Sequence, residues 1–120
     1  MRRFIRYGAI GALATATHYL VLVLCVEGGG WPAWLASGLG AAIGAQVAYF
    51  GNRRFTFAHH GALADSWLKF QGTALLGAVL GMAVVAAGVG LGLHYLLAQV
   101  LATGTTLVLT FAINRAWSFR

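Results

Sequence analysis

The stretch Tyr49-Phe50-Gly51-Asn52-Arg53-Arg54-Phe55-Thr56-Phe57 recurs at the end of the chain as Phe111-Ala112-Ile113-Asn114-Arg115-Ala116-Trp117-Ser118-Phe119. Both copies read aromatic, two residues, Asn-Arg, one residue, aromatic, hydroxyl, Phe. At the same offset Leu35-Ala36 aligns with Leu97-Ala98. With a small shift, Arg3-Phe4 aligns with Lys69-Phe70. The chain therefore consists of two repeats, 3–57 and 67–119, within a single domain, 1–120.

Each repeat contains two apolar runs that precede its Asn-Arg motif. The four runs cover roughly residues 6–26, 31–50, 67–89 and 91–113. Glycines and Pro32 separate the first two runs, and a Gly-rich turn separates the last two, so each repeat is expected to be a helical hairpin. With two spans per repeat both halves have the same orientation, which makes the repeat parallel rather than inverted.

The composition excludes a soluble domain. Hydrophobic residues make up 60% of the 120 residues and charged residues only 8%, whereas about a quarter of a typical soluble domain is charged. A membrane-spanning helix needs ~20 mostly apolar residues, so the length accommodates four spans with short loops. We therefore expect an all-α integral membrane protein with four transmembrane helices. The single Cys25 excludes an internal disulfide.

The positive charges predict the orientation. All eight Lys and Arg residues lie before the first run, around the central loop 52–66 or after the fourth run, whereas Glu27 lies in the loop on the other side. By the positive-inside rule, both termini and the central loop are expected to be cytoplasmic. Charge placed between apolar runs is an orientation signal, so no nucleic-acid partner is expected, although anionic lipids are candidates.

Catalytic groups are scarce. Glu27 and Asp65 are the only carboxylates, and they are expected on opposite sides of the membrane, so they cannot act as an acid and base pair. His59-His60 has no third ligand in view and is interpreted as a solvated loop pair. The sequence predicts neither an enzyme nor a metal or cofactor site.

Several polar side chains fall within the apolar runs, where each needs a partner. In the fourth run, four of them recur at helical spacing and share one face. Two readings stay open: helix packing, or a wet cavity that a substrate crosses. The residues assigned to such a path are His18, Thr15, Gln46, Gln99, Thr103, Thr106 and Thr110.

The Asn-Arg motifs lie at the expected cytoplasmic ends of the second and fourth spans. A guanidinium offers paired donors to a phosphate, and at this depth the phosphate would belong to a lipid headgroup. Alternatively, the arginines only set topology, and the neighbouring aromatic residues form an interfacial belt. The candidate phosphate-binding residues are Asn52, Arg53, Arg54, Asn114 and Arg115.

As a set, these features resemble the GtrA-like membrane proteins over nearly the whole chain. The resemblance rests on Arg3-Phe4 with Tyr7-Gly8, on both Asn-Arg motifs and on Leu93-His94-Tyr95-Leu96-Leu97-Ala98-Gln99. The sequence departs from the family in its short central loop and its Gly-rich first hairpin, neither of which touches the repeated motifs.

The resemblance implies a flippase of polyprenyl-phosphate-linked sugars in the bacterial cytoplasmic membrane, acting in cell-surface polysaccharide synthesis beside a membrane glycosyltransferase. On this reading the arginines hold the phosphate, the Thr and Gln stripe accommodates the sugar, and the lipid tail stays in the bilayer. The competing implication is a non-transporting accessory subunit that stabilises or recruits such a glycosyltransferase. Glycine faces at Gly40/Gly44 and Gly77/Gly81 also suggest a homodimer.

The predicted orientation can be tested by cysteine accessibility. In a chain lacking Cys25, a cysteine at position 29 should react with an impermeant thiol reagent from outside the cell. A cysteine at position 62 should react only after the membrane is opened. The reverse pattern would overturn the topology.

Overall fold

The computed structural model describes residues 2–51, 53 and 63–113. These residues form four α-helices, which confirms the all-α class. Helix α1 is continued without a break by the short π-helix η1. The elements are α1 (Arg2–Val23), η1 (Leu24–Gly28), α2 (Ala33–Gly51), α3 (Leu63–Gly90) and α4 (Tyr95–Ile113).

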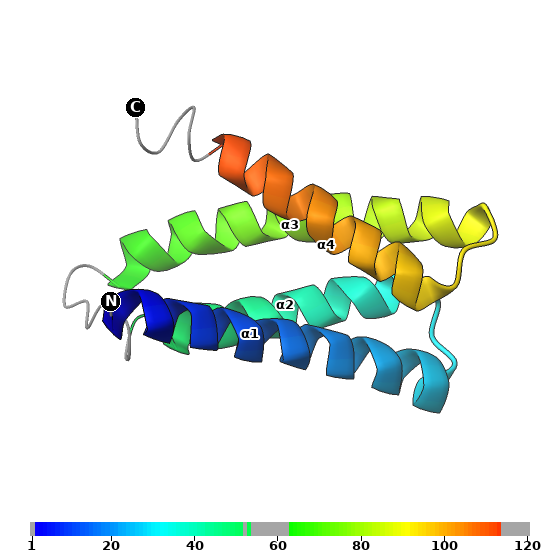
Figure 1. Ribbon diagram of the computed structural model, residues 1–120, viewed down its shortest axis with the longest axis horizontal. Coiled ribbons are helices and arrows are strands. Elements are labelled where there is room, and N and C mark those ends of the chain that lie inside the picture. Colours follow the sequence, from blue (N-terminus) through cyan, green and yellow to red (C-terminus); the bar gives the residue numbers. More distant parts are fainter. Residues whose placement is uncertain (1, 52, 54–62, 114–120) are drawn as a thin grey trace.

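The helices form two antiparallel hairpins that pack side by side. Helix α1 packs along α2, α2 along α3 and α3 along α4. In Figure 1, α4 begins close to α2, crosses α3 and moves away from α1 and α2 toward Ile113. The start of α1, the end of α2, the start of α3 and the end of α4 lie at one end of the bundle, which we call the basic end because it carries Arg2, Arg6 and Arg53.

Most of the helical length is apolar enough for a bilayer. In the described part of the chain, three stretches are long enough to span one: Gly8–Gly28, Ala33–Gly51 and Phe70–Gly90. The apolar part of α4, Tyr95–Leu109, is shorter, although the whole helix has 19 residues and reaches ~28 Å at 1.5 Å per residue. The chain is therefore a multi-pass membrane protein.

The distribution of large and small side chains between the surface and the core reflects the membrane environment. Many large aliphatic side chains face outward, among them Leu107 and Val108 of α4, which are 65% and 70% exposed, whereas Leu22 and Val85 are buried. Small ones such as Ala36, Ala98 and Ala102 are buried. Burying a leucine gains little when lipid is as apolar as the protein interior, so the helices instead gain dispersion energy by close approach of their backbones.

Several helix boundaries differ by a few residues from the predicted apolar runs, among them the starts of α1, α3 and α4. Helix α3 begins at Leu63, within the predicted loop 52–66, because 63–66 contain no helix-breaking residue. Helix α4 begins at Tyr95 rather than at 91, because Gly92 adopts a positive φ of 97° and forms the turn between the helices. The predicted loop 52–66 therefore extends too far at its end, and the predicted fourth apolar run, 91–113, begins too early.

Glycines bring the helices of each hairpin together. A Cβ atom built on Gly40 would lie 2.6 Å from the carbonyl oxygen of His18, and one on Gly44 would lie 2.9 Å from that of Ala14. In the second hairpin, a Cβ on Gly77 would lie 3.1 Å from the methyl group of Thr106. These glycine faces are thus used within the chain, and association into a dimer stays a prediction.

The Gly40 contact leads to a stability prediction. Gly40→Ala should destabilise the protein by about 1–3 kcal/mol, because the obstacle is a backbone oxygen that cannot rotate away. Gly11→Ala is the matched control, since a Cβ there meets nothing within 4 Å. It should be neutral or stabilising by up to about 1 kcal/mol through helix propensity. Thermal unfolding in mild detergent measures both, and an equally stable Gly40→Ala variant would contradict the packing described.

Candidate functional site

A cluster of hydrogen-bonded polar side chains lies in the core, where three of the four helices meet. The Ser37 hydroxyl donates to Gln99 Oε1 at 2.5 Å, and the amide nitrogen of Gln99 lies 3.3 Å from the hydroxyl of Thr103. The hydroxyls of Thr103 and Tyr19 are 2.8 Å apart. Ser37 and Gln99 are each only 2% exposed. This core cluster, Tyr19, Ser37, Gln99 and Thr103, links α1, α2 and α4.

The core cluster lies where the two repeats meet. The offset that superposes the Asn-Arg motifs, and Leu35-Ala36 on Leu97-Ala98, also places Ser37 on Gln99. The hydrogen bond between these two side chains therefore connects equivalent positions of the two repeats. The second hydroxyl contact, from Tyr19, has no such symmetric partner because the equivalent region of α3 holds Val85, a buried core residue.

A second polar pair joins α2 to α3. Gln46 and Gln71 exchange hydrogen bonds: Gln46 Nε2 donates to Gln71 Oε1 at 2.8 Å, and Gln71 Nε2 donates to Gln46 Oε1 at 3.2 Å. Both side chains are half-buried. One turn further toward the basic end, the rings of Tyr49 and Phe70 lie 5.4 Å apart. Since each amide satisfies the other, this pair fixes how α2 and α3 lie along each other.

The other predicted path residues are dispersed. His18 packs against Gly40 in the α1–α2 interface, and its Nε2 atom is buried without a hydrogen-bond partner among the described residues. Thr15 is exposed, and Thr106 packs against Gly77 of α3. The side chain of Thr110 lies outside the described residues. Of the described side chains assigned to the path, only Gln99 and Thr103 contact each other.

Arg53 is the predicted phosphate ligand that the structure describes. It lies two residues after Gly51, the last residue of α2, is half-buried, and its Nη1 atom is buried without a hydrogen-bond partner in the described structure. A buried guanidinium donor without an acceptor is costly, and the described residues provide none for Arg53 Nη1. The other candidate phosphate-binding residues, Asn52, Arg54, Asn114 and Arg115, lie outside the described residues, as does His59-His60.

The opposite end of the bundle holds one acidic contact. Tyr95, the first residue of α4, donates its hydroxyl to the Glu27 carboxylate at 2.8 Å. Glu27 lies in η1 rather than in the predicted loop, so this bond ties η1 to the start of α4. The Glu27 carboxylate at this end and the arginines at the basic end give the bundle the charge asymmetry from which the orientation is predicted.

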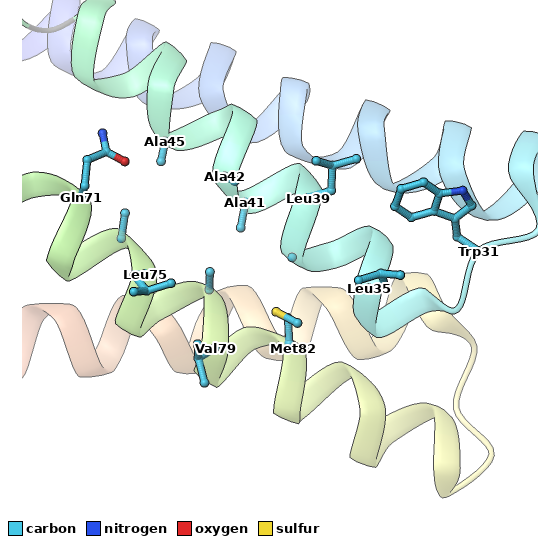
Figure 2. Close-up of a pocket in the computed structure, with 13 residues that line it drawn as sticks. Trp31, Leu35, Leu39, Ala41, Ala42, Ala45, Gln71, Leu75, Val79 and Met82 are labelled. Atoms are coloured by element: carbon cyan, nitrogen blue, oxygen red, sulfur yellow. The ribbon is translucent and has the colours of Figure 1, made fainter.

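A groove runs between α2 and α3 on the outside of the bundle. It encloses about 370 Å³ and is lined mainly by alanines and aliphatic side chains. Figure 2 shows Gln71 at one end of the groove and Trp31 at the other. The groove has room for part of a ligand, and the core cluster lies outside its lining.

These features define a class of protein: a small multi-pass helical membrane protein. It is built from two antiparallel helical hairpins that have the same orientation, and it has a polar core and a basic end. The chain belongs to the family described as GtrA/DPMS, transmembrane domain, whose model matches residues 6–119. This confirms the resemblance drawn from the Asn-Arg motifs. The family is in general a non-catalytic membrane domain with a role in glycan synthesis. No curated protein and no solved structure matches the chain.

Three polar residues of these clusters were missed by sequence reasoning about the site. Ser37 was available from the repeat, because it occupies the position equivalent to Gln99. Gln71 lies two residues after Lys69, and a polar residue so close to a charged one gives no sequence signal of a partner on another helix. Tyr19 gives no sequence signal, since a tyrosine in an apolar run does not reveal where its hydroxyl points.

The amide pair leads to a prediction that tests its structural role. Gln46→Leu alone should destabilise the protein by about 1–2 kcal/mol, because it leaves the Gln71 amide without its partner. The double variant Gln46→Leu/Gln71→Leu should recover most of that loss. Unfolding in detergent measures stability. A double variant less stable than both single variants would contradict a mutually satisfied pair.

Proposed function

We propose that this protein moves polyprenyl-phosphate-linked sugars across the bacterial cytoplasmic membrane during synthesis of cell-surface glycans. The observation that carries the proposal is the Nη1 atom of Arg53, which is buried and has no hydrogen-bond partner among the described residues. In a membrane, an anion at that position would be a lipid phosphate at headgroup depth. Family membership supports the glycan-synthesis setting.

Different residues of the chain would bind different parts of the substrate. A polyprenyl-phosphate sugar has an anionic phosphodiester, a polar sugar and a long apolar tail. Arg53 would bind the phosphodiester through paired N–H donors, and the sequence motifs assign Arg54, Arg115, Asn52 and Asn114 to the same role. The polar residues of α4, Gln99, Thr103, Thr106 and Thr110, would offer hydrogen bonds to sugar hydroxyls during transfer, together with His18, Thr15 and Gln46.

A second function is favoured by the core cluster. Ser37, Gln99 and Thr103 satisfy one another by hydrogen bonds, which is how a packed structural core behaves. The outward side chains of α4, such as Leu107 and Val108, form an apolar surface. Under this alternative the chain is an accessory subunit that stabilises or recruits a membrane glycosyltransferase.

Reconstitution of the purified chain alone separates the two functions. Liposomes would contain a labelled polyprenyl-phosphate hexose in both leaflets, and membrane-impermeant periodate would oxidise only the sugar that reaches the outer leaflet. Transport predicts that the inner pool becomes reactive in liposomes with protein. Reactivity identical to protein-free liposomes would contradict transport and support the accessory function.

Arg53 gives the sharpest residue-level test. Arg53→Lys keeps the positive charge and the topology but removes the bidentate fork, so binding and movement should fall while expression survives. Arg53→Gln should cost more, since a charge-assisted hydrogen bond contributes ~1.5–3 kcal/mol, or roughly ten- to hundredfold in binding.

The matched control is Arg2→Gln, which removes one charge from an exposed arginine at the same end. It should leave binding near the wild-type level. Full activity of Arg53→Lys would contradict phosphate recognition and leave Arg53 as a topology anchor.

A further inference from the structure

The two hairpins contact each other through α2 and α3 on one side and through α1 and α4 on the other. On the α2–α3 side, Met82 packs onto Gly38, and Gln46 and Gln71 exchange two hydrogen bonds. On the α1–α4 side the helices diverge, since α4 moves away from α1 toward the basic end (Figure 1). The α2–α3 side therefore holds the hairpins together, and the α1–α4 side is the one along which they can separate.

Two hydroxyl contacts join the α1–α4 side. Near the middle of the bundle, the hydroxyls of Tyr19 and Thr103 are 2.8 Å apart. At the end opposite the basic end, which we call the acidic end because it carries Glu27, Tyr95 donates its hydroxyl to the Glu27 carboxylate at 2.8 Å. This second bond is exposed, so it can break and re-form without leaving a buried polar group unsatisfied.

The π-helix η1 is the reason why Glu27 reaches α4. An α-helix turns ~100° per residue, so eight residues of unbroken α-helix would place Glu27 ~80° away from the face of α1 that carries Tyr19. Residues Leu24–Gly28 instead form η1, whose wider i→i+5 winding turns only about 80° per residue. Over the four residues that lead to Glu27, the difference amounts to ~80°. Glu27 and Tyr19 therefore lie on the same face, and both contact α4.

The second repeat lacks the polar residue needed for an equivalent contact. The offset that places Ser37 on Gln99 also places Ala33 on Tyr95. An alanine side chain forms no hydrogen bond, and Ala33 packs instead against the buried core around Val85. The hydroxyl contact at the acidic end is therefore specific to the α1–α4 side.

We propose that η1 and the Glu27–Tyr95 hydrogen bond form a latch that closes the α1–α4 side at the acidic end. When η1 rewinds into an α-helix, Glu27 turns ~80° away from Tyr95 and the latch opens. The hairpins then turn about the Tyr19–Thr103 contact, so α1 and α4 separate at the acidic end and approach each other at the basic end. The inference goes beyond the proposed function, because the latch is a property of the chain without any lipid ligand.

Distances between spin labels on the full chain in nanodiscs test the latch. One pair of labels, at the exposed positions Leu24 and Leu91, spans the acidic end. A second pair, at the exposed positions Ile5 and Ala112, spans the basic end. Cys25→Ala removes the native thiol and keeps the number of residues in η1. Pulsed electron paramagnetic resonance on each pair gives the distribution of distances at that end.

Removal of the hydrogen bond should favour the open form. Tyr95→Phe and Glu27→Ala should raise the fraction of molecules with the longer distance at the acidic end about five- to tenfold, as expected for the loss of one hydrogen bond. Both should also shorten the distance at the basic end. Glu27→Gln should stay near wild type, because its amide oxygen still accepts a hydrogen bond. The matched control is Thr105→Val, which removes a hydroxyl that bonds only within α4 and should leave both distances unchanged.

The number of residues in η1 gives a second test. Deletion of Cys25 leaves Glu27 seven residues after Tyr19, which an unbroken α-helix places within ~20° of the same face. The acidic end should therefore stay closed in this variant. Insertion of one alanine between positions 25 and 26 places Glu27 ~180° away in an α-helix, so it should open the acidic end.

Unchanged distances at both ends in Tyr95→Phe and Glu27→Ala would overturn the latch. A longer distance at the acidic end with no change at the basic end would also overturn it, because that result indicates local fraying rather than rotation of the hairpins. Opening on deletion of Cys25 would overturn the role of η1. The measurement uses no lipid-linked sugar, so its failure would leave the proposed function standing, and an absence of transport would leave the latch standing.

Discussion

The requirement that polar groups inside hydrocarbon find partners within the protein governs this structure. In water, Gln99 would bond to solvent from any position, but at 2% exposure in a membrane span it must bond to another side chain. Ser37 provides that partner from α2. The two glutamines between α2 and α3 satisfy each other in the same way. These polar contacts set the positions of helices that lipid would otherwise leave free to slide.

Close packing follows from the same environment. Since a large side chain gains as much from lipid as from the core, the hairpins close over glycine and alanine, as at Gly40 against His18. Between α2 and α3 a groove remains, lined by alanine and aliphatic side chains. Bonding is left incomplete at the buried Nη1 atom of Arg53, which has no hydrogen-bond partner among the described residues.

Much of this architecture could be read from the sequence, because composition and the repeated Asn-Arg motif constrain it strongly. The hairpins, the family and the use of the glycine faces all follow from periodic patterns. The polar residues were harder to assign. Helical spacing placed Thr106 on the stripe with Gln99, but it packs on α3 instead. Helical spacing predicts the face of its own helix on which a residue lies. Which neighbouring helix packs against that face depends on how the helices cross, and no single sequence pattern encodes that geometry.

The hydrogen bond between Ser37 and Gln99 joins the two repeats, and a double-mutant cycle on these two residues measures it directly. Ser37→Ala, Gln99→Leu and the double variant would be unfolded in lipid or mild detergent and their stabilities compared. A favourable coupling energy of about 0.6–1.7 kcal/mol is expected for a hydrogen bond between membrane helices. Additive effects, with no coupling between the two positions, would contradict a direct bond joining the repeats at the centre of the protein.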